Sequence, residues 1–327
     1  MAVAAPAQEP RFRDEIEVRR VVVEARAVDK TGNALLGLGK ADFLVEVDGR
    51  PVPLEAVDWI PQSRPLEAPG DVPPVAGDIS SAVPRGRLVV YVFQTDLQPL
   101  RLTGLFRMTP KARQFLAGLD PEDRVAVLAF DSHLKLHLDF TSDRERLRDL
   151  LNPPALLQEP EPLPPGRPPS LAASFDYRAA RDAATPEQGL LVTARALRTI
   201  PGTKTLALFG WGLGKLWGRA GVAMTIDYAP ARQALIDART AVCAIDITDA
   251  DYHDLEVGLE RVAWDTGGFY AKTNLFPDLA MRRLAGALAG HYELVFRRPV
   301  LPRGTHRIEV TLAGGRGVVM ARSSYVD

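Results

Sequence analysis

Hydrophobic and polar residues alternate along both ends of the chain, as they do in strands with one buried face. Near the N-terminus this pattern predicts a strand over 17–28, and a hairpin follows with Asp48-Gly49 as its turn. Near the C-terminus it predicts three more strands, Tyr292–Phe296, Arg307–Leu312 and Val318–Ala321. Neither end has enough apolar surface to form a domain alone. We therefore expect 16–60 and 298–327 to form one small β-sandwich domain.

The middle of the chain follows a different pattern, in which short apolar runs alternate with helical segments. Leu88–Phe93 is continuously apolar, as expected for a strand that is covered on both faces. Further strands are expected at 125–130, 133–140, 205–209, 242–246 and 269–270. Repeated strand–helix units with one antiparallel member predict a doubly wound, mostly parallel α/β sheet over 86–297, with one antiparallel edge strand. This α/β domain would be inserted into the sandwich.

Local signals predict where several helices begin. Thr109-Pro110 suits an N-cap followed by a proline at the first helical position. Two capping boxes, Ser142–Glu145 and Thr185–Gln188, each predict a helix that follows them.

Fourteen of the 27 prolines gather in two places. Six lie from Pro61 to Pro84 and eight from Pro153 to Pro169. Because proline lacks a backbone donor, such clusters form neither helices nor central strands. We expect a Pro-rich linker over 61–85 and a Pro-rich insertion over 152–184. Residues 1–15 are expected to be a disordered N-terminal segment.

Composition excludes several classes of function. The 327 residues carry 40 Lys and Arg against 41 Asp and Glu, so no basic field attracts nucleic acid or anionic lipid. No apolar run is long enough to span a bilayer. One cysteine, Cys243, rules out an intrachain disulfide. The first ten residues lack a basic and a leucine-rich stretch, so no intact signal peptide is expected there, although they look like the small residues after a cleavage site.

Short motifs in a fixed order connect the chain with a known family. They are Leu38–Phe43 with Val47–Gly49, Asp123–Val127 with Phe130–Ser132, Asp139–Asp143, Ile200–Thr205 and Ala263–Gly268. On these motifs the central body resembles a von Willebrand factor type A domain. The whole chain resembles the bacterial VWFA-related proteins that are frequent in Acidobacteria. The resemblance implies an exported, non-enzymatic adhesion or protein-binding module, periplasmic or secreted, while a cytoplasmic location stays open.

The resemblance also implies a metal-ion-dependent adhesion site, from which this sequence departs. The family places Asp-x-Ser-x-Ser after its first strand and an Asp after its fourth, because Mg²⁺ needs about six oxygen ligands. Here the corresponding stretches are Phe93–Leu97, with Phe93 in the Asp position, and Phe209–Gly212, with Trp211 in place of the carboxylate. We expect this site to be degenerate and the protein to use no metal or cofactor. The alternative is a weak, relaxed Mg²⁺ site at Asp96.

Other combinations of residues have plainer interpretations. Asp265-Thr266-Gly267 matches the aspartic-protease triplet, but a single copy at a helix end is read as structural. The strand that carries His133 and His137 is expected to present a solvated face. The acidic cluster Asp246, Asp249, Asp251 and Asp254, with His253 among them, suits a polar loop before a helix and, as a minority interpretation, a cation site. No nucleophile is identifiable, so no enzymatic activity is predicted.

The sequence therefore predicts a binding surface at the carboxyl edge of the central sheet. Its candidate residues are Gln94, Thr95, Asp96, Trp211 and Trp217, together with the Pro-rich insertion. Two interpretations of the tryptophans are open: an exposed hot spot, or a fold back onto the insertion. The expected partner is another protein. The alternatives are a metal-dependent adhesin and a structural subunit of a larger, peripherally membrane-associated assembly.

Overall fold

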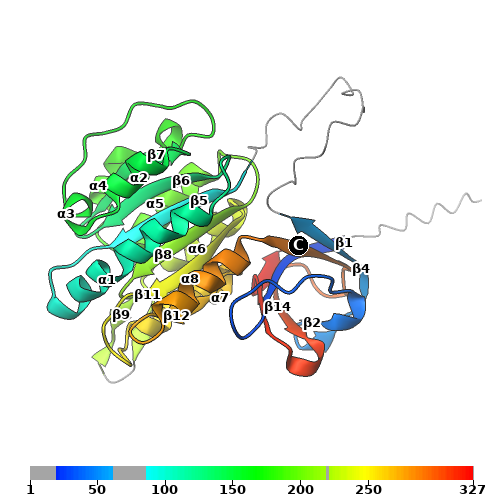
Figure 1. Cartoon of the computed structure of the whole chain (residues 1–327). Coiled ribbons are helices and arrows are strands. Elements are labelled where there is room, and N and C mark those ends of the chain that lie inside the picture. Colours follow the sequence, from blue (N-terminus) through cyan, green and yellow to red (C-terminus); the bar gives the residue numbers. More distant parts are fainter. Residues whose placement is uncertain (1–19, 62–85, 219–220, 327) are drawn as a thin grey trace, which may run out of the picture.

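Six strands form the central sheet in the order β12-β11-β8-β5-β6-β7. They are β5 (Leu88–Gln94), β6 (Arg124–Phe130), β7 (Leu134–Thr141), β8 (Lys204–Gly210), β11 (Thr240–Asp246) and β12 (Tyr270–Lys272). All neighbours are parallel except β6 and β7. The computed structural model describes residues 20–61, 86–218 and 221–326. The sheet confirms the predicted von Willebrand A-like fold, with one antiparallel strand at its edge (Figure 1).

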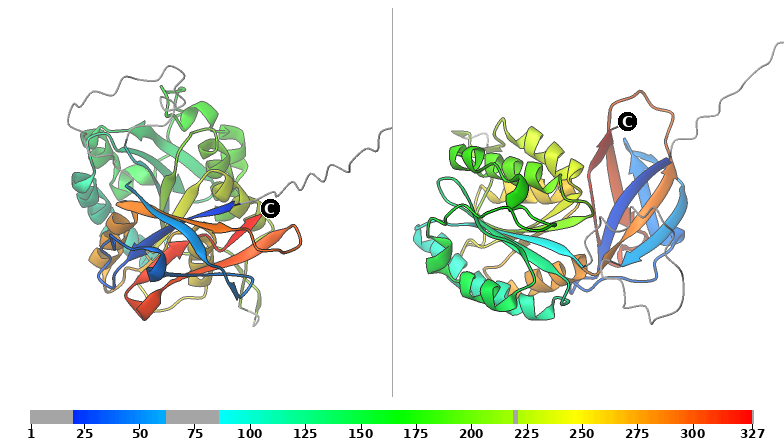
Figure 2. Two further views of the ribbon diagram at one scale, coloured as in Figure 1. Left: turned by 90° about the vertical axis from the view of Figure 1, so that its right-hand side faces the viewer. Right: turned by 90° about the horizontal axis from the view of Figure 1, so that it is seen from above.

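Helices cover both faces of this sheet and form a core with each face (Figure 2). One face packs against α1 (Pro99–Phe115), α2 (Arg144–Leu150) and α8 (Pro277–Ala287). The other packs against α5 (Pro186–Leu197), α6 (Tyr228–Asp237) and α7 (Glu256–Thr266). Because both faces are buried, the parallel strands β5, β6, β8 and β11 are apolar through their central residues, and polar residues stand at their ends.

The expected helix start at Thr109-Pro110 is wrong, because α1 begins at Pro99 and runs through both residues. Met108 and Ala112 are fully buried on the same helix and hold this turn against the sheet. Pro110 and Phe106 lie exposed, so the carbonyl that loses its helical partner to the proline faces water. Tertiary packing therefore overrides the local start signal.

The two chain ends meet in a β-sandwich, as predicted. One sheet has the order β15-β1-β13-β4 and the other β16-β14-β2-β3. Alternate residues of both sheets point into a shared core that includes Val23, Val45 and Leu294. The strands are β1 (Arg20–Val28), β2 (Phe43–Val47), β3 (Arg50–Pro51), β4 (Leu54–Pro61), β13 (Gly290–Arg297), β14 (Thr305–Leu312), β15 (Val318–Ala321) and β16 (Ser324–Val326).

The expected boundary after residue 297 needs a correction. Strand β13 pairs with β1 and β4, so it belongs to the sandwich although the boundary assigned it to the α/β body. The body therefore ends with α8, and the sandwich resumes at Gly290. The reason is the alternating pattern of β13, which buries Tyr292, Leu294 and Phe296 in the sandwich core.

The Pro-rich insertion packs over the edge strand β7. It contains the short helices α3 (Pro153–Leu156) and α4 (Tyr177–Asp182) and buries Leu171 and Phe175 in the core. Glu159 contacts His133 and Lys135, and Asp139 accepts hydrogen bonds from Ser170 and Leu171. The expectation of a solvated face on this strand is therefore wrong. The insertion covers a strand edge that would otherwise be open to pairing.

Two further expectations fall on residues that the structure does not describe. The N-terminal segment 1–15 lies outside the described residues, and so does the linker 61–85 apart from Pro61, which ends β4. Among the described residues, the search for a helix with the length and hydrophobicity of a membrane span finds none.

Candidate functional site

Four loops meet at the carboxyl edge of the central sheet, on the side away from the sandwich (Figure 1). These crest loops are 95–98 after β5, 211–227 after β8, 247–255 after β11 and 273–276 after β12. The loop after β11 contacts the loops after β8 and β12 and the first turn of α1. Asp249 N–H donates to the Leu100 carbonyl in the first turn of α1, and Leu213 N–H donates to the Leu255 carbonyl. Asn274 Nδ2 donates to Asp251 Oδ1 over 2.6 Å.

Gln94, at the end of β5 just before the loop 95–98, forms hydrogen bonds with the loop after β8. Its Nε2 donates to the Gly212 carbonyl over 2.8 Å, and its Oε1 accepts from the backbone N–H groups of Trp211 and Gly212 at 2.7 and 3.1 Å. The sequence comparison placed Phe93 in the Asp position of the family motif. In the structure the last residue of β5 is Gln94, and Phe93 stacks on Phe209 in the core. An amide that donates and accepts holds the loop after β8 directly.

Gln94 and Thr95 cannot themselves contact a partner in this conformation. Their side chains are 1% and 2% exposed. Thr95 N–H donates to the Phe130 carbonyl over 2.8 Å, and its hydroxyl has no partner among the described residues. We therefore assign both residues a supporting role beneath the loops.

Asp96 and Trp211 are joined by one arginine. Arg101, from the first turns of α1, pairs with the Asp96 carboxylate and lies 3.6 Å from the centroid of the Trp211 ring. Asp96 also accepts from the Gln98 N–H over 2.9 Å. Trp211 therefore neither stands free nor folds onto the Pro-rich insertion. The carboxylate expected to offer a weak metal site is already neutralised by a guanidinium.

Trp217 lies in an exposed hairpin of β9 (Lys215–Leu216) and β10 (Val222–Ala223), and it is 71% exposed. Large exposed apolar side chains also project from the other crest loops and from the start of α1. Together they form what we call the crest patch: Leu97, Leu100, Leu216, Trp217, Ile226, Tyr252, Leu275 and Phe276. Sequence reasoning found only Trp217 of this set, because single apolar residues in separate loops form no pattern along the chain.

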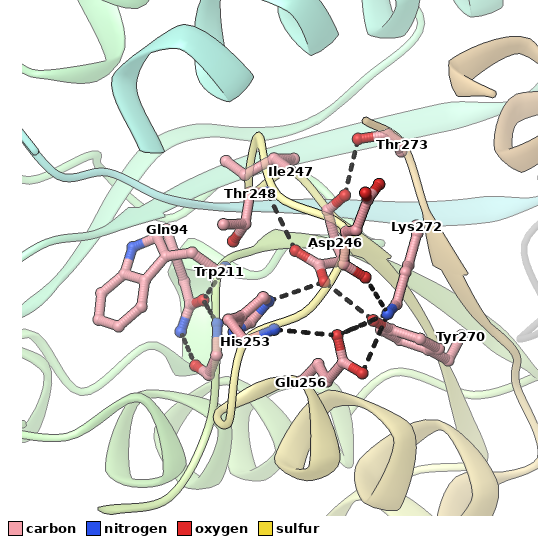
Figure 3. A network of polar contacts seen from close by, with 12 residues as sticks. Gln94, Trp211, Asp246, Ile247, Thr248, His253, Glu256, Tyr270, Lys272 and Thr273 are labelled. Atoms are coloured by element: carbon pink, nitrogen blue, oxygen red, sulfur yellow. Dashed lines mark hydrogen bonds and ion pairs between the residues drawn. The ribbon is translucent and has the colours of Figure 1, made fainter. Parts of the chain in front are cut away.

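A polar network lies below the loop after β11 (Figure 3). Asp246 Oδ2 accepts from His253 Nε2 at 2.8 Å and from the Tyr270 hydroxyl at 2.9 Å. Lys272 Nζ lies 3.0 and 2.8 Å from the two oxygens of Glu256. The hydrogen bonds from His253, Thr248 N–H and Tyr270 hold the pKa of Asp246 below its usual range despite its burial. Burial and the neighbouring Asp246 raise the pKa of Tyr270, so its hydroxyl stays a donor.

Asp246, His253 and Glu256 place three potential ligand atoms within 4.8 Å of one another, a spacing that a divalent cation could use. However, their atoms are engaged by partners of this same network, and the Lys272 ammonium already supplies the positive charge. Of the acidic cluster of the sequence, Asp246 belongs to this network, whereas Asp249 pairs with Arg107 and Asp251 accepts from Asn274. At the crest itself the residues present do not fit a magnesium ion, since Gln94, Trp211 and an arginine-bound Asp96 replace the oxygen ligands.

We expect calorimetry with Mg²⁺ or Mn²⁺ to show no saturable binding in the sub-millimolar range, because a metal ion would have to displace Arg101 or Lys272. Two variants locate any binding that does occur. Binding lost in Asp96→Ala would establish the relaxed crest site, and binding lost only in Glu256→Gln would place the ion in the Asp246 network.

The aspartic-protease triplet has a structural role. Asp265 accepts from the Tyr228 hydroxyl at 2.6 Å and from the Ser323 hydroxyl at 2.9 Å. Gly267 ends α7 in the left-handed conformation, with φ of 77°. Asp265 thus joins α7 to the sandwich.

Comparisons with known proteins find likeness in structure alone. No protein-family model and no curated protein matches this sequence. A von Willebrand factor type A structure from Catenulispora acidiphila is 10% identical, covers 95% of this chain and 75% of its own, and has a TM-score of 0.43. BatB from Bacteroides thetaiotaomicron is 12% identical, covers 62% and 98%, and has a TM-score of 0.39. The manganese-loaded TRAP protein of Plasmodium vivax is 9% identical, covers 73% and 94%, and has a TM-score of 0.40.

These likenesses are too distant to carry a functional conclusion. The von Willebrand A-like class rests on the strand order, the antiparallel edge strand and the helices on both faces.

Proposed function

We propose that this protein is a non-enzymatic binding module that holds another protein through its crest loops without a divalent ion. The observation that carries the proposal is the crest patch, eight large apolar side chains exposed on neighbouring loops and the adjoining first turn of α1 at one edge of the sheet. Gathered exposed apolar residues mark interaction surfaces, whereas single ones are ordinary.

The chemistry of the crest supports apolar contact over metal coordination. Asp96 is bound by Arg101, and Gln94 uses its amide on backbone groups of the loop after β8. Large apolar side chains are prominent among the accessible residues of the crest loops: Trp217 is 71% exposed and Ile226 90%. Aromatic side chains of this kind commonly dominate the binding energy of protein interfaces. The proposal also takes from the sequence resemblance that the protein is a bacterial VWFA-related protein, periplasmic or secreted.

The test compares capture of a partner by the whole chain and by variants. The double variant Trp217→Ser and Ile226→Ser is expected to lower the affinity for the captured partner by about tenfold or more, as for a hot spot of at least ~1.4 kcal/mol. Chelation with EDTA should leave capture unchanged.

A matched control removes exposed apolar side chains elsewhere. Leu44 and Val300 lie on the sandwich and are 56% and 100% exposed. Leu44→Ser with Val300→Ser should keep full affinity. Equal losses in the two double variants would show nonspecific stickiness, and a loss with EDTA alone would favour the metal-dependent adhesin.

A further inference from the structure

A cleft of about 270 Å³ lies between the sandwich and the amino edge of the central sheet, at the end of the sheet opposite the crest. Figure 2 shows the ribbons of these two parts of the chain next to each other. Strand β1 turns its odd-numbered residues Val21 to Ala27 into the sandwich core. Because side chains alternate along a strand, Val22, Glu24 and Arg26 face outward and line the cleft. The opposite wall comes from the α/β body, at the start of β11 and the end of α7.

Three arginines line this cleft, and two of them have partners. Arg239, from the turn before β11, pairs with Glu24. Arg322, from the turn between β15 and β16, donates to the Val22 carbonyl over 2.9 Å. The other acidic residue of the lining, Glu293, has a carboxylate oxygen 4.0 Å from His291.

Arg26 is the exception. It is only 4% exposed, its Nε has no hydrogen-bond partner, and it makes no ion pair with any described residue, although its charge helps to lower the pKa of the nearby Glu24. A buried charge of this kind is costly unless something pairs with it. A guanidinium offers five donors in a planar fork that fits the oxygens of a carboxylate or a phosphate.

The lining of the cleft carries three arginines against two carboxylates, those of Glu24 and Glu293. Burial, and then the nearby Arg239, lower the pKa of Lys204 to about 8. Burial likewise lowers the pKa of Arg322.

We propose that this cleft binds a small oxyanion, a phosphate or carboxylate group, on the Arg26 guanidinium with Arg322 and Arg239 at its margins. The volume is that of roughly nine water molecules, enough for inorganic phosphate, a small phosphate ester or a small organic acid. Its walls come from both parts of the chain, so a bound anion braces the sandwich against the α/β body. This site is independent of the crest.

The experiment measures anion binding by calorimetry and the melting temperature of the full chain in a phosphate-free chloride buffer. Inorganic phosphate and citrate are the two probes, and they distinguish a phosphate from a carboxylate ligand. For at least one probe we expect saturable binding with a Kd of about 1 mM or tighter and a rise in melting temperature. No saturable heat from either probe up to about 10 mM would overturn the proposal.

The decisive variant is Arg26→Gln, with Arg148→Gln on the exposed face of α2 as the control for the change in charge. Arg26→Gln should weaken binding by about tenfold or more, the loss expected for one charge-assisted contact. Arg148→Gln should leave binding unchanged. Equal weakening in both variants would reduce the effect to general electrostatics and contradict the site.

The melting temperature in anion-free buffer shows whether Arg26 serves anion binding or the stability of the fold. Because Arg26 makes no ion pair and its Nε has no hydrogen-bond partner, Arg26→Gln should melt at or above the wild-type temperature in anion-free buffer. A lower melting temperature would make Arg26 a structural counter-charge for Glu24 and Glu293, and the proposal would fall. Should Arg26→Gln fail to fold, Arg322→Gln decides: weakened anion binding in that variant supports the site, and unchanged binding contradicts it.

Discussion

Asp123→Ala is expected to lower the free energy of unfolding by about 3 to 5 kcal/mol, because it breaks a buried ion pair and leaves an arginine without its partner. Asp123 is fully buried at the turn before β6. It accepts hydrogen bonds from Arg87 Nε at 2.9 Å, from the Arg87 N–H at 2.7 Å and from the Asp120 N–H at 2.7 Å. No other described carboxylate can replace it, since Asp120 reaches Arg87 only at 3.3 Å and is half exposed.

The effect should extend to the junction of the two parts of the chain. Arg87 also donates through Nη1 to the Leu288 carbonyl, just before β13 enters the sandwich at Gly290. Asp123 therefore fixes the arginine that joins the start of β5 to the end of α8.

Urea unfolding followed by circular dichroism measures this prediction. Asp120→Ala is the matched control, and it should cost less than about 1 kcal/mol because an exposed ion pair contributes little. If the two variants were equally stable, the buried pair would contribute no more than the surface pair, and this account of the turn would be wrong.

The layout of the fold was predictable because the order of apolar and polar residues in each strand indicates which of its faces are buried. Strand β5 is buried at all seven positions, and its apolar run identifies it. The sandwich strands alternate instead, with β2 showing the burial pattern of every second residue. A continuous apolar run indicates a strand in a sheet covered on both faces, whereas alternation indicates a strand with one face in the core.

Features that depend on contacts between distant segments were not predictable. Strict alternation places Leu134, Leu136, Leu138 and Phe140 on one face of β7. In the structure a break in the register between β6 and β7 sends Leu138 to the opposite core. The cover over Lys135 comes from an insertion that its prolines mark as irregular, and nothing in those prolines indicates where it packs.

The candidate site was predicted in position but not in roles. Parallel strands end at one edge, so the loop after β5 and the loop after β8 had to meet. Whether a polar residue there faces a partner or turns inward depends on which backbone groups lack hydrogen bonds. Gln94 turns inward for this reason, and Arg101 covers Trp211 because α1 begins ten residues before the signal used to place it. The Arg26 cleft left no sequence signal at all, since its walls come from both parts of the chain.

Replacing Gln94 by Leu tests the role of this buried amide and is expected to cost about 2 to 4 kcal/mol of stability. The leucine side chain removes three hydrogen bonds and leaves the Trp211 N–H, the Gly212 N–H and the Gly212 carbonyl without their partner. Each buried polar group left unsatisfied costs about 1 to 3 kcal/mol, and partial entry of water into the loosened loop offsets part of that sum. The Gln94 amide packs closely against Gly210, because a Cβ built on Gly210 would lie 2.6 Å from Gln94 Oε1.

The same substitution should also weaken partner capture, because the loop after β8 carries Trp217 and is held by Gln94. Urea unfolding and capture are therefore measured on the same variants. Gln114→Leu is the control, because Gln114 is exposed on α1 and lies outside the crest loops. Stability and capture should both fall in Gln94→Leu and both persist in Gln114→Leu. If Gln94→Leu is stable but has lost capture, Gln94 contacts the partner directly. If it is unstable but keeps full capture, partner binding does not depend on the fixed position of the loop after β8.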